Sequence, residues 1–268
     1  MEHTIDLTRR SFLVHASRGT IALAVLSVAG CGPSAVGSAR PTGDPSSSAA
    51  PDPSMPTVSG GGASNPPASA SSGGVTWERA NLGFVSAYVL ARGGEAAIVD
   101  TGGGGSEGTI HDALVAAGLD WAQVGHVILT HRHGDHAGSI GAVLAAASSA
   151  TAYAGEADIP AITSPRPLTA VADGETVFGL RIVATPGHTA GHIAVFDEVG
   201  GILVAGDALG TSTGTLMGSN PQFTEDAEQA KASVVKIGDL TFETLLVGHG
   251  EPILEGASAQ VAALAASS

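Results

Sequence analysis

Residues 131–136 read His131-Arg-His133-Gly-Asp135-His136 and directly follow an apolar segment that predicts a β-strand. Three imidazoles and one carboxylate within six residues exceed what packing requires. In a turn, the first two histidines can point to one side while Asp135 and His136 point to another, which suits two neighbouring metal ions. Imidazole and carboxylate ligands favour zinc, and iron and manganese are the alternatives for the same ligands.

Three further candidate ligands stand at the ends of later apolar segments. His188 lies in Thr-Pro-Gly-His-Thr-Ala-Gly-His, which ends at His192; Asp207 closes Leu-Val-Ala-Gly-Asp; and His249 lies in Leu-Val-Gly-His-Gly. A glycine adjoins each of them, and glycine allows a close approach of the backbone to a bound ion. A single histidine or aspartate at a strand end is commonly a hydrogen-bonding residue, but three added to residues 131–136 predict a metal centre.

The pattern of apolar and polar residues predicts a mixed α/β domain that begins near Val75 and runs to the end of the chain, residues 75–268. Short apolar runs and turn residues bound the elements. The predicted strands are 75–79, 85–90, 96–100, 126–130, 151–154, 181–184, 192–196, 202–205 and 244–247, and the predicted helices are 109–117, 137–147, 225–237 and 258–266.

The order His-x-His-x-Asp-His, Thr-Pro-Gly-His-Thr-x-Gly-His, Gly-Asp and Gly-His-Gly resembles the metallo-β-lactamase-fold hydrolase superfamily, over Asp100 to His249. The resemblance implies an αββα four-layer sandwich with the metals at one edge between the sheets. It also implies a ligand set for two divalent ions, most simply zinc: His131, His133 and His188 on the first, Asp135, His136 and His249 on the second, and Asp207 bridging both.

Two more residues are expected to support these ligands from outside. Asp100, in Val-Asp-Thr-Gly, matches an early aspartate of the family, and His192 is expected to be a neighbour of the site without ligating. Two metal ions sharing a water would lower its pKa from 15.7 toward about 7, so that hydroxide attacks a carbonyl group. Asp135 and Asp207 are the predicted catalytic carboxylates, and Asp135 could pass a proton to the leaving group.

Details of the pattern favour the glyoxalase-II-like, lactonase-like branch, which cleaves thioesters, lactones and other ester-like bonds. The domain has no cysteine for the ligand set of the main zinc β-lactamases, and it has Asp207, which another lactamase subclass generally lacks. Only 19 residues follow His249 and none is Lys or Arg, so the glutathione-holding helical domain of glyoxalase II is not expected. The alternatives are a mononuclear iron oxygenase resembling persulfide dioxygenases, and a metal-binding sensor domain without turnover.

The N-terminal region predicts export and lipid anchoring. Residues 1–30 resemble a twin-arginine signal, with Arg9-Arg10, an apolar stretch and a lipobox that ends at Cys31, the only cysteine. Residues 31–74 are dominated by Gly, Ser, Pro and Ala and predict a disordered tether. We therefore expect a domain lipid-anchored at Cys31 on the outer side of the cytoplasmic membrane or in the cell envelope.

The composition limits the partners. The chain has 11 Lys and Arg against 25 Asp and Glu, a net charge of −14, and no basic run beyond the arginine pair of the signal. Nucleic-acid binding needs clustered positive charge, so that class is excluded. The expected substrate is a small molecule that is neutral or weakly charged. The segment 210–223, which offers small polar groups with Leu216, Met217 and Phe223, is expected to line its pocket.

Overall fold

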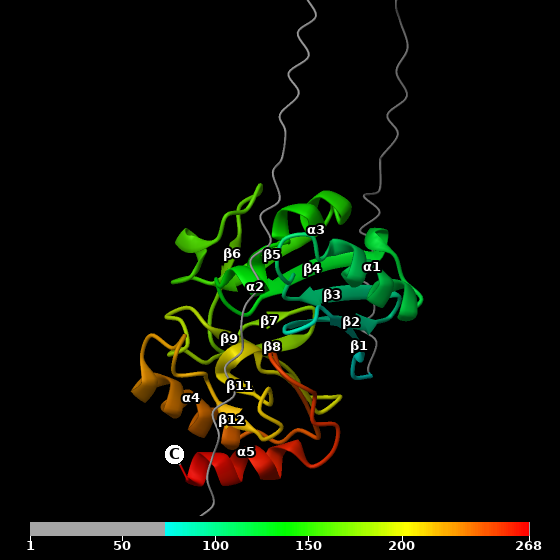
Figure 1. The fold of residues 1–268 in the computed structure, drawn as a ribbon. Coiled ribbons are helices and arrows are strands. Elements are labelled where there is room, and N and C mark those ends of the chain that lie inside the picture. Colours follow the sequence, from blue (N-terminus) through cyan, green and yellow to red (C-terminus); the bar gives the residue numbers. More distant parts are fainter. Residues whose placement is uncertain (1–72, 268) are drawn as a thin grey trace, which may run out of the picture. The chain divides into compact units, whose positions relative to one another are not determined.

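The computed structural model describes residues 73–267 (Figure 1). The predicted signal, residues 1–30, lies outside the described residues, as do Cys31 and the predicted tether up to residue 72. Among the described helices, none is long and apolar enough to cross a membrane.

The first sheet has six strands in the order β1-β2-β3-β4-β5-β6. Its first three strands are antiparallel neighbours, and β3 to β6 run parallel to one another. Because β4 ends one residue before Thr130, its carboxyl end delivers the histidine-rich turn to one edge of the sheet. The strands are β1 (Thr76–Asn81), β2 (Ser86–Arg92), β3 (Glu95–Val99), β4 (Val124–Leu129), β5 (Thr151–Gly155) and β6 (Thr169–Val171).

The second sheet has five strands in the order β13-β10-β9-β8-β7, and a separate two-stranded hairpin, β11-β12, follows Asp207. Only β10 and β13 pair in parallel in this sheet, so their carboxyl ends lead to Asp207 and His249 at the same edge. The strands are β7 (Thr176–Val177), β8 (Leu180–Ala184), β9 (Ile193–Asp197), β10 (Ile202–Val204), β11 (Leu209–Gly210), β12 (Met217–Gly218) and β13 (Thr244–Leu246).

Helices cover the outer face of each sheet (Figure 1). Side chains of α1 and α3 pack with the first sheet, and side chains of α4 and α5 pack with the second. The helices are α1 (Glu107–Ala116), α2 (Gly134–Ala137), α3 (Ile140–Ala146), α4 (Ala227–Gly238) and α5 (Ala257–Ala266), with short 3₁₀ turns at Trp121–Gln123, Ile159–Ala161 and Gly206–Ala208.

Alternation along the strands produces three apolar cores and hence four layers. In β3, Ile98 packs toward the helices of the first sheet while Val99 packs between the two sheets. In β9, Val195 packs between the sheets while Phe196 packs toward the helices of the second sheet. The predicted αββα sandwich is therefore confirmed.

The helix predicted over 137–147 is interrupted in the structure. It is split into α2 and α3 at Gly138 and Ser139. The loop after β3 crosses at this point: Ser139 Oγ accepts a hydrogen bond from Ser106 N at 2.9 Å, and a Cβ on Gly138 would lie 3.1 Å from Gly102 O. This long-range contact ends the first helix where local pattern predicts continuation.

Leu203 of β10 is fully buried in the core beneath α4 and α5. We expect Leu203→Ala to lower the free energy of unfolding by about 2–5 kcal/mol, because the cavity left behind loses packing contacts. Val199→Ala, at a residue that is 67% exposed, should change it by less than about 0.5 kcal/mol. Urea unfolding followed by circular dichroism compares the two variants, and equal destabilisation would contradict this core assignment.

Candidate metal centre

The turn after β4 is fixed by hydrogen bonds to Asp100. Thr130 donates from its backbone N to Asp100 Oδ1 at 2.7 Å and from its hydroxyl to Asp100 Oδ2 at 2.8 Å. His131, next in the chain, is fully buried, and its Nδ1 lies 3.1 Å from Thr130 Oγ1. Its Nε2 is therefore the nitrogen that faces the other histidines.

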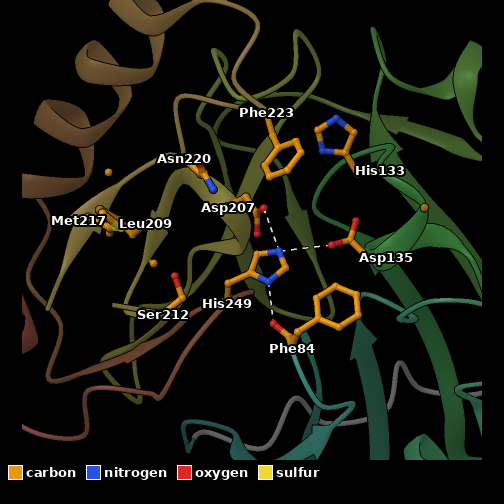
Figure 2. A pocket seen from close by; sticks show the side chains of 13 residues that line it. Phe84, His133, Asp135, Asp207, Leu209, Ser212, Met217, Asn220, Phe223 and His249 are labelled. Carbon is orange, nitrogen blue, oxygen red and sulfur yellow. Dashed lines mark hydrogen bonds and ion pairs between the residues drawn. The ribbon is translucent and has the colours of Figure 1, made fainter. Parts of the chain in front are cut away.

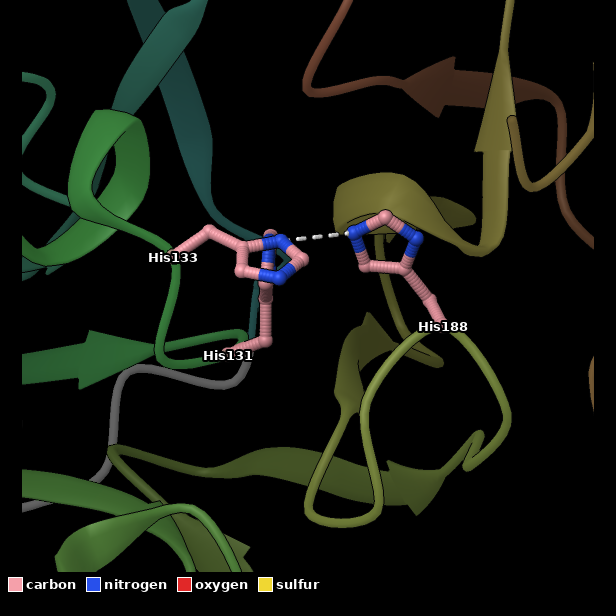
Figure 3. Close-up of side chains that lie close together, drawn as sticks. All are labelled: His131, His133 and His188. Atoms are coloured by element: carbon pink, nitrogen blue, oxygen red, sulfur yellow. Dashed lines mark hydrogen bonds between the residues drawn. The ribbon is translucent and has the colours of Figure 1, made fainter. Parts of the chain in front are cut away.

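Three imidazoles converge on one point in Figure 3: His131, His133 and His188. His133 Nδ1 lies 3.0 Å from His131 Nε2 and 3.0 Å from His188 Nε2. The three come from the turn after β4 and from the loop between β8 and β9, which are far apart in the sequence. Three imidazole nitrogens meeting in this way form a ligand group for a divalent ion.

A second group lies beside it and consists of Asp135, His136 and His249. His249 Nε2 is 3.3 Å from Asp135 Oδ2 and 3.4 Å from His136 Nε2. The other ring nitrogen of His249, Nδ1, lies 2.7 Å from the carbonyl oxygen of Phe84. This contact turns Nε2 toward the carboxylates of Asp135 and Asp207 (Figure 2).

Asp207 lies between the two groups and contacts both. Its Oδ2 is 3.4 Å from His188 Nε2 and 3.2 Å from His249 Nε2, and its Oδ1 is 3.1 Å from His136 Nε2. Asp207 also forms a third ligand group with His131 and His136. Its Oδ1 is buried without a hydrogen bond of good geometry, so a lone pair remains for a cation.

Asp100 and His192 lie outside the ligand groups and contact residues of those groups, Asp100 at the ring of His136 and His192 at the backbone of Asp207. Asp100 Oδ2 lies 2.8 Å from His136 Nδ1, and the residue adopts a left-handed backbone with φ of 63°, a conformation that costs a non-glycine residue energy. His192 uses both ring nitrogens elsewhere: Nδ1 lies 2.8 Å from Thr185 Oγ1, and Nε2 accepts the backbone N–H of Asp207 at 3.0 Å. His192 thus orients the segment that carries Asp207.

Burial keeps several of the imidazoles neutral. It lowers the pKa of His131 well below its usual value, lowers the pKa of His188 to about 4, and lowers the pKa of His192 to about 3. A neutral imidazole offers a lone pair without first losing a proton. His131 and His188 are therefore prepared to bind a metal at neutral pH.

The carboxylates of the site remain ionised. Burial would raise the pKa of Asp207, but His136 beside it holds that pKa well below its usual range. Hydrogen bonds to Asp135 and Asp207 raise the pKa of His249 to about 10, and its hydrogen bond in turn lowers the pKa of Asp135. Positive charge between Asp135 and Asp207 is thus favoured electrostatically, and a divalent cation would supply that charge. The donor set fits divalent metal ions.

A pocket of about 540 Å³ opens over the second group (Figure 2). The hairpin β11-β12 and the segment after it form one wall, so the segment expected from the sequence does line the pocket. Leu216 is an exception, because it packs into the core under α4 and α5. The lining residues are Phe84, His133, Gly134, Asp135, Asp207, Leu209, Gly210, Ser212, Met217, Gly218, Asn220, Phe223 and His249.

Two pocket residues lie outside the segments expected from the sequence, Leu209 and Phe84. Phe84 lies in the turn between β1 and β2, is 70% exposed, and stacks on His249 with ring centroids 6.0 Å apart. Two features of the sequence could have indicated Phe84: aromatic residues are only 4% of this chain, and this one follows Gly83 in a turn. Two histidines outside the motifs lie away from these groups: His111 stacks on Trp121, and the ring of His126 contacts Tyr153.

The fold and the ligand groups define a metal-binding αββα domain. The family model of the metallo-beta-lactamase superfamily matches residues 80–249, and the chain belongs to this superfamily. A metallo-beta-lactamase family protein from Thermus thermophilus superposes with a TM-score of 0.58 at 25% identity, covering 72% of this chain and 79% of that structure.

Two relatives carry names of hydrolases. A hydroxyacylglutathione hydrolase from Acidiphilium cryptum is 36% identical over 172 residues, covering 61% of this chain and 63% of the relative. A thioesterase from Emericella nidulans is 29% identical over 172 residues, covering 62% of this chain and 46% of the relative. The chain thus spans less than two thirds of either protein. Membership of the superfamily and these relatives support metal-dependent hydrolysis in general.

Asp100→Asn should weaken metal binding about 10–100-fold, because an amide is a poorer partner for His136 Nδ1 and for the Thr130 donors than a carboxylate is. Competition with a chromophoric chelator measures this affinity. Asp120→Asn, at an exposed carboxylate paired with His111, is the matched control and should leave the affinity unchanged. Equal affinities for wild type and Asp100→Asn would show that Asp100 does not act through His136.

Proposed function

We propose that the protein is a dinuclear metal-dependent hydrolase, most simply with zinc, that cleaves an ester-like bond in a small molecule. One observation carries the proposal: Asp207 contacts His188 of one ligand group and His249 of the other with the same carboxylate. A carboxylate between two ligand groups is suited to hold two ions close together. Two such ions would supply a water of lowered pKa and polarisation of the scissile carbonyl.

The residues of the chain would have three roles in this reaction: metal binding, charge compensation and proton transfer. The first group, His131, His133 and His188, would bind one ion with neutral imidazoles, and Asp207 would compensate positive charge on both ions. Asp135 belongs to the second group, lines the pocket, and has a side chain that is 31% exposed. Because Oδ2 faces His249, the other oxygen, Oδ1, would be the one to take a proton from the attacking water and pass it at once to the departing oxygen, sulfur or nitrogen.

The pocket favours an acyl substrate that is neutral or weakly charged. Its lining contains no Lys or Arg among the described residues, and Phe84, Leu209, Met217 and Phe223 give it apolar walls. Ser212 and Asn220 add uncharged hydrogen-bonding groups on the wall formed by the hairpin. These walls suit a thioester, ester, lactone or lactam better than a polyanion. The hydrolase relatives support the same class of bond.

A mononuclear iron oxygenase that acts on sulfur is the competing proposal. The group of His131, His136 and Asp207 supports it, because two imidazoles and one carboxylate are the ligands of many non-haem iron oxygenases. The hydrolase is favoured because Asp135 and His249 would have no role on a single iron ion.

For the whole chain we propose the location expected from residues 1–31: outside the cytoplasmic membrane, held there by lipid on Cys31. Fractionation of cells that make wild-type protein or Cys31→Ala tests it. The wild type should sediment with membranes and the variant should not. Equal release of both proteins would contradict lipid anchoring.

Assays of the metal-loaded chain on a panel of substrates with different bonds test the proposed hydrolase activity. The panel holds an acyl thioester, a lactone, an aryl ester, a β-lactam, a phosphodiester and a persulfide, with oxygen uptake recorded for the last. We expect turnover of one or more carbonyl substrates and none of the phosphodiester. Oxygen uptake with one iron per chain would establish the oxygenase instead, and metal binding without any turnover would favour a sensor domain.

A further inference from the structure

Arg132 stands between two predicted metal ligands, His131 and His133, yet its side chain points to neither. Its backbone N donates to Asp158 Oδ2 at 2.9 Å, and its Nη1 donates to Asp158 Oδ1 at 3.0 Å. Its Nη2 pairs with Glu225 Oε1. A single arginine therefore joins two carboxylates that come from separate parts of the chain.

Asp158 connects the histidine-rich turn to the loop that carries His188. Its side chain is fully buried, and besides the two donors of Arg132 it accepts from Thr189 Oγ1 at 2.6 Å and from Gly191 N at 2.9 Å. Four donors on one buried carboxylate make a strong and directional connection.

Glu225 holds the same loop from the other side. Its Oε2 accepts from Ala190 N at 3.1 Å, and its backbone N donates to Gly187 O at 3.1 Å and to His188 O at 3.2 Å. Arg132 thus links the two carboxylates that bracket the loop around His188.

The backbones around this connection are in tight contact. A Cβ on Gly191 would lie 2.5 Å from Asp158 N, and a Cβ on Gly155 would lie 2.0 Å from Gly191 O. The segment after β5 and the loop after β8 therefore fit together only because glycine stands at both positions. Such close fitting leaves little room for the loop to slide.

The His188 ring has little direct support of its own. The nitrogen that faces away from the site, Nδ1, has only Thr224 Oγ1 near it among the described residues, at 3.5 Å, the outer limit of a hydrogen bond. By contrast, His136 has Asp100 at 2.8 Å and His249 has Phe84 O at 2.7 Å. The position of His188 consequently depends on how its loop is held.

We propose that Arg132, together with Asp158 and Glu225, is a positioning unit that fixes His188 opposite His131 and His133. The unit maintains the 3.0 Å separation between His133 Nδ1 and His188 Nε2. The inference rests on the metal binding of the proposed function and adds residues that do not touch the ions. Arg132 would then position a metal ligand, and would not serve only as a spacer between His131 and His133.

The test is cobalt binding to the full chain after chelator treatment, with three variants. We expect Arg132→Ala to weaken binding of the tightest cobalt ion about 10–100-fold and to change the visible absorption of bound cobalt, because the ligand geometry loosens. Glu225→Gln keeps an acceptor for Ala190 N but removes one charge, so it should shift affinity and spectrum less, in the same direction. Arg132→Lys should restore part of the loss, because an ammonium group keeps the charge without the forked geometry.

Arg181→Ala is the matched control. Arg181, on β8, pairs with one carboxylate, Glu198, just after β9, and its replacement should leave the cobalt spectrum unchanged. Melting of the metal-free proteins separates positioning from folding: the Arg132→Ala spectrum should change even where its melting temperature matches that of Arg181→Ala. If Arg132→Ala does not fold, Glu225→Gln carries the test.

An unchanged cobalt spectrum and affinity in Arg132→Ala and Glu225→Gln would overturn the positioning unit. That result leaves the hydrolase intact if wild type still cleaves its substrate. Conversely, a wild type that binds cobalt and shows the predicted variant effects, but cleaves no substrate, would overturn the hydrolase and retain the positioning unit.

Discussion

Asp207→Ala is expected to lower kcat/KM for the hydrolysed substrate by about 10³-fold or more. Its carboxylate contacts His188, His136 and His249 at once. Its loss removes the shared ligand and leaves Asp135 as the one carboxylate among the proposed ligands to offset the charge of the ions. Activation of water and carbonyl by the ions is worth several kcal/mol, and each 1.36 kcal/mol is tenfold in rate.

Steady-state kinetics with measured metal content checks this expectation. Asp207→Asn keeps the shape and one oxygen acceptor but not the charge, so it should retain more metal than the alanine variant while hydrolysing far more slowly than wild type. Asp120→Ala, at an exposed carboxylate whose contacts are with His111, Trp121 and Gln123 and not with the ligand groups, is the control. Hydrolysis by Asp207→Ala at the wild-type rate would refute a bridging role.

Removal of metal is expected to abolish hydrolysis and to lower the melting temperature by about 10 °C. One ion present at about 1,000 times its dissociation constant stabilises a fold by about 4 kcal/mol, and about 2–4 °C per kcal/mol is typical of a domain of this size, so loss of the tighter ion alone accounts for this shift.

Thermal melting and activity before chelation, after chelation and after zinc is returned measure both effects. The same chelator saturated beforehand with zinc is the control, because it cannot extract metal but has the same chemistry otherwise. Return of activity and of the melting temperature on adding zinc is expected. Full activity in chelator-treated protein with no detectable metal would contradict the proposed chemistry.

Much of the fold could be predicted from the sequence because alternation in the strands is regular. The apolar runs that became β4, β8 and β10 each end at a motif with a ligand in it, and strand ends of a layered fold meet at one edge. That geometry explains why His131, His188 and Asp207 lie together despite their distance in the sequence. The resemblance to the superfamily then supplied the αββα arrangement, which the structure confirms.

Other features depend on contacts that no local pattern contains. Strands β7, β11 and β12 have only two residues each, too few for a period to be recognised, and β6 has three residues of which two are exposed, so no apolar run marks it. The break at Gly138 and Ser139 is caused by a loop 33 residues earlier in the chain. Phe84 reaches the pocket from a hairpin turn, and the link from Arg132 to Asp158 and Glu225 exists only once separate segments have folded together.

Titration of the metal-free chain with zinc, while hydrolysis of an active substrate is followed, tests the central claim most directly. If two ions share Asp207, the rate should rise until two equivalents of zinc per chain are bound and then stay constant. A rate that is already maximal at one equivalent, or that is independent of zinc, would contradict the dinuclear hydrolase.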